Sequence, residues 1–326
     1  MTASVKKYSI GLLIIAKDAE GIIGRAIKSA KGFCSQIVVV DTGSADRTSS
    51  AATSLGAEIH YFKWVNDFSA ARNYGLQFMV TDWVLSLDCD EVIDADSFLR
   101  QKFLLENDYC GGIKVNIRNE LKEGGEIIET THKAVRIFRN LQAIKYEGSI
   151  HEQVTPSILE TGLSVVDSDF VIRHYGYSEK SSEKIARNRS MLLDELKKQP
   201  DDDWLKYHLA ETEFASGNTG IAESLFATLK NSKSLDFPEQ ETVRIRLGQI
   251  YLNNNNCVKS KAVLDFKSVD DGREGFRLFI LAAAEAASGN IAGAIELYSN
   301  PIVRQSAMVG KQLLEKCIDD LKSALN

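Results

Sequence analysis

Residues 37–56, which read IVVVDTGSADRTSSAATSLG, decide the fold. The stretch opens with four consecutive apolar residues, as expected of a strand that is covered on both faces. A helical segment follows over residues 46–55, and Gly56 is a typical helix stop. A buried strand that leads through a polar turn into a helix is one unit of an α/β fold.

Similar units lie on both sides of this stretch. The apolar run at residues 10–15 predicts a first strand, and the apolar spacing of residues 21–31 predicts a helix. Further strands are predicted at residues 59–62 and 83–87, and Ser69 can cap a helix between them that runs to about Met79. This alternation predicts a mostly parallel sheet with helices on both faces. In such sheets ligands bind beyond the carboxyl ends of the strands.

From about residue 178 the strand patterns end and helical ones take over. Helices are predicted within residues 204–218, 243–256 and 276–290, and each ends in a small or polar turn. These turns recur at intervals of 38 and 34 residues, counted from Asn218 to Asn256 and from Asn256 to Asn290. A period near 34 with paired helices is the signature of tetratricopeptide repeats, although a plain helical bundle also fits. We therefore predict an α/β domain at residues 1–178 and an all-α helical-repeat domain at residues 179–326.

The composition excludes several classes of protein. A chain of 326 residues with 44% hydrophobic and 26% charged residues is a globular protein too long for one ordinary core. A net charge of -6 and a pI near 5.5 argue against nucleic acid or an anionic membrane as the main partner. The five scattered cysteines lack a C-x-x-C spacing and favour a reducing compartment. No apolar run approaches a membrane span, so we expect a cytoplasmic protein, either free or peripheral at the inner membrane.

The strongest chemical signal is the stretch at residues 87–91, LDCDE, at the end of the fourth predicted strand. Positions i and i+2 of an extended chain face the same side, so Asp88 and Asp90 can point into one site. Two carboxylates at a strand end suit Mg²⁺ or Mn²⁺ held together with substrate phosphates. Such a metal would neutralise the charge that grows on a diphosphate leaving group. The alternative is an acidic loop that caps the next helix.

Two further polar residues follow predicted strands or begin predicted helices. Asp41 leaves its strand at the carboxyl end, where it can accept a hydrogen bond from a base or a ribose. Its alternative role is that of a turn residue, because Asp-Thr-Gly-Ser is rich in turn formers. Arg72 lies near a helix start and can reach a phosphate, with a surface ion pair as the alternative.

Taken in order, these motifs resemble family 2 glycosyltransferases. More narrowly, they resemble the bacterial branch whose catalytic domain is followed by tetratricopeptide repeats. The resemblance is carried by residues 16–20, 41–48, 67–73 and 82–91, and later by residues 148–153 and 174–177. The chain departs from the family pattern at Asp18, where Asn is more frequent, and at Cys89, where Ala is frequent. Neither departure changes the charge of the paired aspartates.

The resemblance implies the GT-A fold, a nucleotide-sugar donor such as a UDP-sugar, a divalent metal (Mn²⁺ or Mg²⁺) and usually inversion at the anomeric carbon. It places Asp88 and Asp90 at the ribose, the metal and the diphosphate. His151 would lie near the metal, where a neutral imidazole is a suitable ligand. The donor-binding residues that it implies are Ala16, Asp18, Asp41, Ser44, Arg72 and Asp88.

Two carboxylates compete for the role of catalytic base. An inverting transfer needs a carboxylate to take the proton of the acceptor as the acceptor attacks. Glu152 is the first candidate and Glu91 is the second.

Two other functions remain open at this point. The chain could be a protein-interaction scaffold with a degenerate transferase domain. It could also be a nucleotidyltransferase, but residues 16–21 contain a single glycine where such enzymes need a glycine-rich phosphate loop. The sequence does not specify the acceptor, for which a lipid-linked saccharide, a lipopolysaccharide core or a protein fits a role in envelope glycan synthesis. We expect the helical half to bind the acceptor or a protein partner, with a purely structural role as the alternative.

Overall fold

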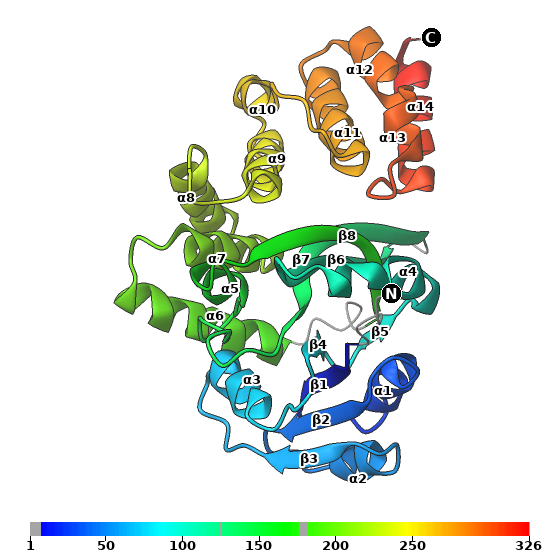
Figure 1. Cartoon of the computed structure of the whole chain (residues 1–326). Coiled ribbons are helices and arrows are strands. Elements are labelled where there is room, and N and C mark those ends of the chain that lie inside the picture. The colour runs from blue at the N-terminus through cyan, green and yellow to red at the C-terminus, as the bar shows by residue number, and fades with distance from the viewer. Residues whose placement is uncertain (1–7, 124–125, 176–181, 326) are drawn as a thin grey trace. The chain divides into compact units, whose positions relative to one another are not determined.

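A computed structural model describes residues 8–123, 126–175 and 182–325 (Figure 1). The chain divides into two compact units. Unit 1 comprises Met1–Glu120 and Thr131–Glu179, and unit 2 comprises Leu121–Thr130 and Lys180–Asn326. The domain boundary predicted at residue 178 lies outside the described residues, as does Tyr177 of the last motif.

Unit 1 is built on a mixed sheet with the strand order β3-β2-β1-β4-β7-β6-β8-β5. The first four strands along the chain are parallel, β7 is antiparallel to β4, and β8 is parallel to β6. The predicted α/β fold class is therefore confirmed. The strands are β1 (Ile10–Ala16), β2 (Gln36–Asp41), β3 (Glu58–Tyr61), β4 (Trp83–Leu87), β5 (Glu91–Ile93), β6 (Cys110–Glu123), β7 (Glu126–Arg139) and β8 (Ser164–His174).

Helices cover both faces of the parallel strands, which explains their continuous apolar runs. Leu12 and Ile14 of β1 pack in one core with Ile23 and Ile27, whereas Leu13 packs in a second core on the other face. Figure 1 shows α1 and α3 on opposite sides of the sheet at β1 and β2. The helices of unit 1 are α1 (Ile23–Ala30), α2 (Thr48–Thr53), α3 (Phe68–Leu76), α4 (Ala95–Gln101), the 3-10 helix η1 (Lys102–Glu106) and α5 (Thr155–Glu160).

The start and the end of α3 differ from the prediction. Asp67, in extended conformation, is the N-cap, because its carboxylate accepts a hydrogen bond from the Ala70 N–H at 2.8 Å. Ser69, the predicted cap, lies inside the helix, and its hydroxyl donates to the carbonyl of Gly148. The prediction of Ser69 as the cap was therefore wrong. The helix also ends at Leu76, before the predicted Met79.

The segment Lys180–Asn326 of unit 2 is built from paired helices, as predicted, while the rest of the unit comes from the ends of β6 and β7. The pairs α7–α8, α9–α10 and α11–α12 are each joined by a short turn with a left-handed residue, which is Gly217, Asn255 and Gly289 in turn. Asparagine can replace glycine there because its short polar side chain tolerates a positive φ. The helices are α6 (Ser182–Lys198), α7 (Asp203–Ala215), α8 (Thr219–Leu229), α9 (Phe237–Asn253), α10 (Cys257–Val263), α11 (Asp271–Ala287), α12 (Ile291–Tyr298), α13 (Pro301–Gln305) and α14 (Lys311–Leu325).

The first and third pairs share a side-chain contact at the turn. The amide of Asn218 donates to Glu213 at 2.7 Å, and the amide of Asn290 donates to Glu285 at 3.0 Å. This recurrence supports a repeat architecture over an irregular bundle. Among the described residues, no helix is both long and apolar enough to cross a membrane.

Candidate active site

The carboxyl ends of β1, β2 and β4 meet at one edge of the sheet. Ala16 is the register partner of Asp41, and Ile14 is the partner of Leu87, the residue before Asp88. The topology therefore brings together the loops that the sequence predicts as the donor site.

The loops after β1 and β2 are joined by direct hydrogen bonds. The Asp18 N–H donates to the Ser44 hydroxyl at 3.0 Å, and the Asp18 carboxylate accepts from the Ala45 N–H at 2.7 Å. Asp18 has a left-handed backbone with φ at 48°, a conformation that Asp and Asn tolerate best among side chains with a Cβ. The side-chain oxygen of Asp18 that accepts from Ala45 has a counterpart in asparagine. Asp18 can therefore make the same contact as the Asn that is more frequent at this position.

Asp41 forms hydrogen bonds within its own turn. Its carboxylate accepts from the Gly43 N–H at 2.9 Å, from the Ser44 N–H at 2.7 Å and from the Ser49 hydroxyl. Burial disfavours charge on Asp41, but these hydrogen bonds outweigh it and lower the pKa of the carboxyl group. The carboxylate thus shapes the 41–44 turn at the end of β2.

Asp88 is held between two arginines. One carboxylate oxygen accepts from Arg72 at 2.7 Å, and the other accepts from Arg136 at 3.0 Å. Burial opposes charge on Asp88, yet the guanidinium groups of Arg136 and Arg72 outweigh it and lower its pKa. Asp88 is therefore ionised and fixed in orientation.

Arg72 is buried, with only 3% of its side chain exposed. Its Nε donates to Glu152 at 2.5 Å, one terminal nitrogen donates to the Ser86 hydroxyl at 2.8 Å, and the other donates to Asp88. The predicted alternative of a surface ion pair was wrong, because the ion pairs of Arg72 lie inside the domain. Arg72 links Glu152 to Asp88 across 64 residues of chain.

Arg136, on β7, was not predicted from the sequence. Its Nη2 donates to Asp88 and, at 2.6 Å, to Glu91. The second oxygen of Glu91 accepts from the Asp88 N–H at 2.9 Å, so both oxygens of this buried carboxylate are occupied. Burial raises the pKa of Glu91 despite the neighbouring Arg136. Nothing in the strand pattern around Arg136 indicates this role, since it depends on the pairing of β4 with β7.

Asp90 begins a row of polar side chains. The His174 ring lies 3.1 Å from Asp90 through Nε2 and 2.8 Å from the Asn119 side-chain oxygen through Nδ1. The Asn119 amide nitrogen in turn lies 3.2 Å from Nδ1 of His132. Burial opposes charge on His174, but the bond to Asp90 outweighs it and raises the pKa of the ring. Asn119 and His132 were not predicted as site residues.

His151 lies in a loop that is tied to the start of α3. Gly148 and His151 both have left-handed backbones, and the Ser149 carbonyl accepts from the Phe68 N–H at 2.8 Å. Burial lowers the pKa of His151 to about 4, so its imidazole is neutral at pH 7. The neutral imidazole is the form of histidine that can ligate a metal, as the prediction requires.

The comparison with protein families matches this region. Residues 12–160 match the model described as glycosyl transferase family 2. The chain carries a family 2 glycosyltransferase domain. Its fold is the predicted GT-A fold, and the helical-repeat domain follows it.

Two curated relatives of the glycosyltransferase domain and its surroundings illustrate the similarity. A TPR repeat-containing protein of Synechococcus elongatus is 31% identical over 60% of this chain and 50% of its own length. An uncharacterized glycosyltransferase of Rickettsia typhi is 34% identical over 27% of this chain and 30% of its own length. This chain thus spans half or less of the length of both relatives.

Solved structures resemble the glycosyltransferase domain only distantly. One is the glucosyl-3-phosphoglycerate synthase from Mycobacterium tuberculosis, which is 16% identical with a TM-score of 0.44. The match covers 58% of this chain and 79% of that chain.

The donor atoms of the glycosyltransferase domain fit a divalent metal in part. Asp90 and His151 offer a carboxylate and a neutral imidazole, whereas both oxygens of Asp88 are taken by guanidinium groups. Within the described ranges no group of three or more His, Cys, Asp or Glu side chains is placed to hold a metal. Mg²⁺ is usually bound through one or two carboxylates and completes its shell with substrate phosphates and water, so Asp90 together with a donor diphosphate is compatible with such an ion.

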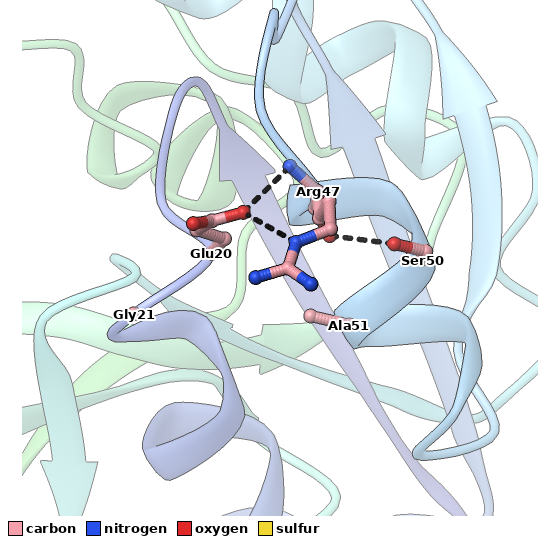
Figure 2. Close-up of a pocket in the computed structure, with 5 residues that line it drawn as sticks. All are labelled: Glu20, Gly21, Arg47, Ser50 and Ala51. Atoms are coloured by element: carbon pink, nitrogen blue, oxygen red, sulfur yellow. Dashed lines mark hydrogen bonds and ion pairs between the residues drawn. The ribbon is translucent and has the colours of Figure 1, made fainter.

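A shallow pocket of about 370 Å³ lies beside the predicted donor site (Figure 2). It is lined by Glu20 and Gly21 of the loop after β1 and by Arg47, Ser50 and Ala51 at α2. Figure 2 shows Glu20 accepting hydrogen bonds from the backbone and the side chain of Arg47. The Arg47 side chain is 85% exposed, so this ion pair is a surface feature that holds the two loops together.

Proposed function

We propose that the chain is a metal-dependent, inverting glycosyltransferase that transfers a sugar from a nucleotide-sugar to a saccharide, lipid-linked or protein acceptor. One observation carries this proposal. Within a family 2 domain, the loops that bear Asp41, Asp88 and Asp90 lie at the carboxyl edge of parallel strands, where α/β sheets bind ligands. A UDP-sugar is the first donor to test.

The nucleotide would bind across the ends of β1 and β2. The 41–44 turn and Ala16–Asp18 supply backbone groups and the Ser44 hydroxyl at this edge. Since Asp41 already bonds to Gly43, Ser44 and Ser49, it would act mainly by fixing the turn against which the base or ribose packs. Asp88, oriented by its two arginines, would contact the ribose or the diphosphate.

The metal would be held by Asp90 and His151 together with the diphosphate of the donor. When bound, it would supply positive charge against the negative charge that develops on the leaving diphosphate. Asp90 is the carboxylate best suited to this task, because Asp88 is neutralised by Arg72 and Arg136.

Glu152 is the better of the two candidate bases. Both oxygens of Glu91 are engaged and its side chain is buried, so an acceptor hydroxyl has little access to it. Glu152 is bonded to Arg72 through Oε1, and this bond would orient it toward an attacking hydroxyl. The proton of the acceptor would pass to Glu152 as the new glycosidic bond forms.

Hydrolysis of a panel of UDP-sugars, with and without Mn²⁺, tests this proposal. We expect hydrolysis that disappears in EDTA and that falls by at least about 100-fold in Asp90→Asn, since transition-state charge loses its main stabiliser. Asp96→Asn, at an exposed carboxylate on α4, is the matched control and should hydrolyse normally. The same assay should show a larger loss of kcat in Glu152→Gln than in Glu91→Gln.

Full activity in EDTA or in Asp90→Asn would contradict the metal-dependent mechanism. Absence of hydrolysis and of binding for every UDP-sugar would favour the scaffold hypothesis, provided that other nucleotide-sugars also fail.

A further inference from the structure

A row of three side chains leads away from Asp90 into the sheet. It runs from His174 through Asn119 to His132, with consecutive polar atoms 2.8–3.2 Å apart. Each member comes from a different strand: β8, β6 and β7. None of the three was assigned a role in the proposed reaction.

The strand register explains why these residues meet. Asn119 of β6 is the direct register partner of His174 in the parallel β6–β8 pair. Glu91 of β5 is the partner of His174 on its other side. Side chains of register partners lie on the same face of a sheet, so His174 is fixed between the acidic turn and Asn119.

Asn119 is the buried centre of the row. The residue is 4% exposed, and a buried amide needs hydrogen bonds to offset the loss of water. Its oxygen faces His174 and its nitrogen faces His132, so both ends of the amide serve the row. His132 is exposed and is the last member of the row, at the surface.

This arrangement constrains the rotation of each member. The Asn119 amide can turn end for end only by breaking contact with both histidines at once. The His174 ring is likewise held at two nitrogens, and Asp90 is held by His174. Residues that orient a metal ligand in this manner affect metal affinity without contacting the metal.

We propose that Asn119 and His132 are positioning residues that hold His174 and thereby preorganise Asp90 for the divalent metal of the donor complex. This inference rests on the proposed function, because it assumes that Asp90 binds the metal. It extends the site to β6 and β7, which the donor-site motifs do not include.

The test is direct measurement of the Kd for Mn²⁺ on the full-length chain with saturating UDP, by electron paramagnetic resonance of free Mn²⁺. We expect Asn119→Leu and His132→Leu each to raise the Kd at least about 10-fold, the lower end of the range for residues that support metal ligands. His132→Asn retains an acceptor where Nδ1 stands and should restore a Kd close to that of wild type.

Asn116→Leu is the control for the loss of a half-buried, hydrogen-bonded amide. Asn116 lies on the same strand, but its amide donates to the Ser168 and Phe170 carbonyls. We expect it to lower thermal stability and to leave the Kd for Mn²⁺ within about twofold. If Asn119→Leu does not fold, the pair His132→Leu and His132→Asn decides, because His132 is exposed.

The outcomes distinguish a failure of the proposed metal role from a failure of the positioning role. Wild-type chain that fails to bind Mn²⁺ would overturn the metal role in the proposed function. Wild-type chain that binds Mn²⁺ with variants of unchanged Kd would overturn the positioning role alone. Equal loss of affinity in His132→Asn and His132→Leu would also overturn it, because the retained acceptor would then have no effect.

Discussion

The buried ion cluster sets the character of the site at the scale of single residues. Arg72 and Arg136 face Asp88, Glu91 and Glu152, so three acids share two cations. Buried ion pairs contribute little net stability when complete, but removal of one partner leaves a buried charge without compensation. The cluster therefore fixes the geometry of the acids, and mutation of one member is expected to lower stability strongly.

We expect Arg72→Met to lower the free energy of unfolding by about 3–5 kcal/mol, because Glu152 and Asp88 lose a buried partner. Arg47→Met is the control, since the Arg47–Glu20 pair is exposed and its loss should leave the unfolding midpoint unchanged. Urea denaturation followed by circular dichroism measures both. Wild-type stability in Arg72→Met, combined with a raised KM for the donor, would instead support the phosphate contact expected from the sequence.

The acids of the site are predictable from the sequence, but their partners are not. Asp41, Asp88 and Asp90 follow apolar runs, and this local pattern places them at strand ends. Arg136 and Asn119 lie within strands that pair with residues far away in the chain, and that pairing has no local signal. For the same reason the sequence could not tell that Arg72 is buried.

At the scale of elements, the close approach of α3 to the sheet positions Arg72. A Cβ on Gly75 would lie 2.5 Å from Leu13 Cδ1 and 2.7 Å from Val40 Cγ2. Only glycine allows the helix to approach β1 and β2 this closely. Because Arg72 is one turn before Gly75 on the same helix, the spacing between α3 and the sheet also sets the position of its guanidinium group.

Gly75→Ala should therefore destabilise unit 1 by about 1–3 kcal/mol through overpacking. It should also slow UDP-sugar hydrolysis, because α3 must shift and carries Arg72 with it. Gly24→Ala on α1 is the matched control, since its Cβ would meet only Leu55 Cδ1 at 3.6 Å. There, alanine should be neutral or stabilise by up to about 1 kcal/mol. Calorimetric melting and the hydrolysis assay decide, and equal behaviour of the two variants would contradict the argument.

Elements with continuous apolar runs are the ones that the sequence predicts best. Strands β1, β2 and β4 are covered on both faces, and their runs are unmistakable. Strand β6 instead alternates, with Ile113, Val115 and Ile117 buried between more polar residues. That alternation is a strand signal in its own right, so the existence of β6 is predictable from the sequence. The strand order remains a matter of long-range pairing.

At the scale of the whole molecule, the two units have separate hydrophobic cores. The cores of unit 1 centre on the sheet, and those of unit 2 lie between successive helices. The residues proposed for chemistry belong to unit 1. We propose that the helical unit binds the acceptor or a protein partner, as expected from stacked helix pairs that offer extended surfaces.

If the chemistry resides in unit 1, damage to each core should have a different effect. Phe226 of α8 and Phe138 of β7 are both fully buried, one in each unit. Truncation of a buried phenylalanine to alanine costs about 3–5 kcal/mol. We expect Phe226→Ala to melt the helical unit at a lower temperature, because the stability of a repeat array depends on contacts between neighbouring repeats. The variant should leave metal-dependent UDP-sugar hydrolysis within about twofold of wild type at 25 °C, because the residues proposed for chemistry belong to unit 1.

Phe138→Ala is the matched variant. It should lower the melting temperature of unit 1, and hydrolysis should disappear at that lowered temperature. Calorimetry identifies the transition that moves, and hydrolysis across the same temperature range shows which unit carries the reaction. Loss of hydrolysis in Phe226→Ala at a temperature where unit 1 is still folded would show that the helical unit takes part in the chemistry itself. Its proposed role would then have to change from acceptor binding to support of the catalytic site.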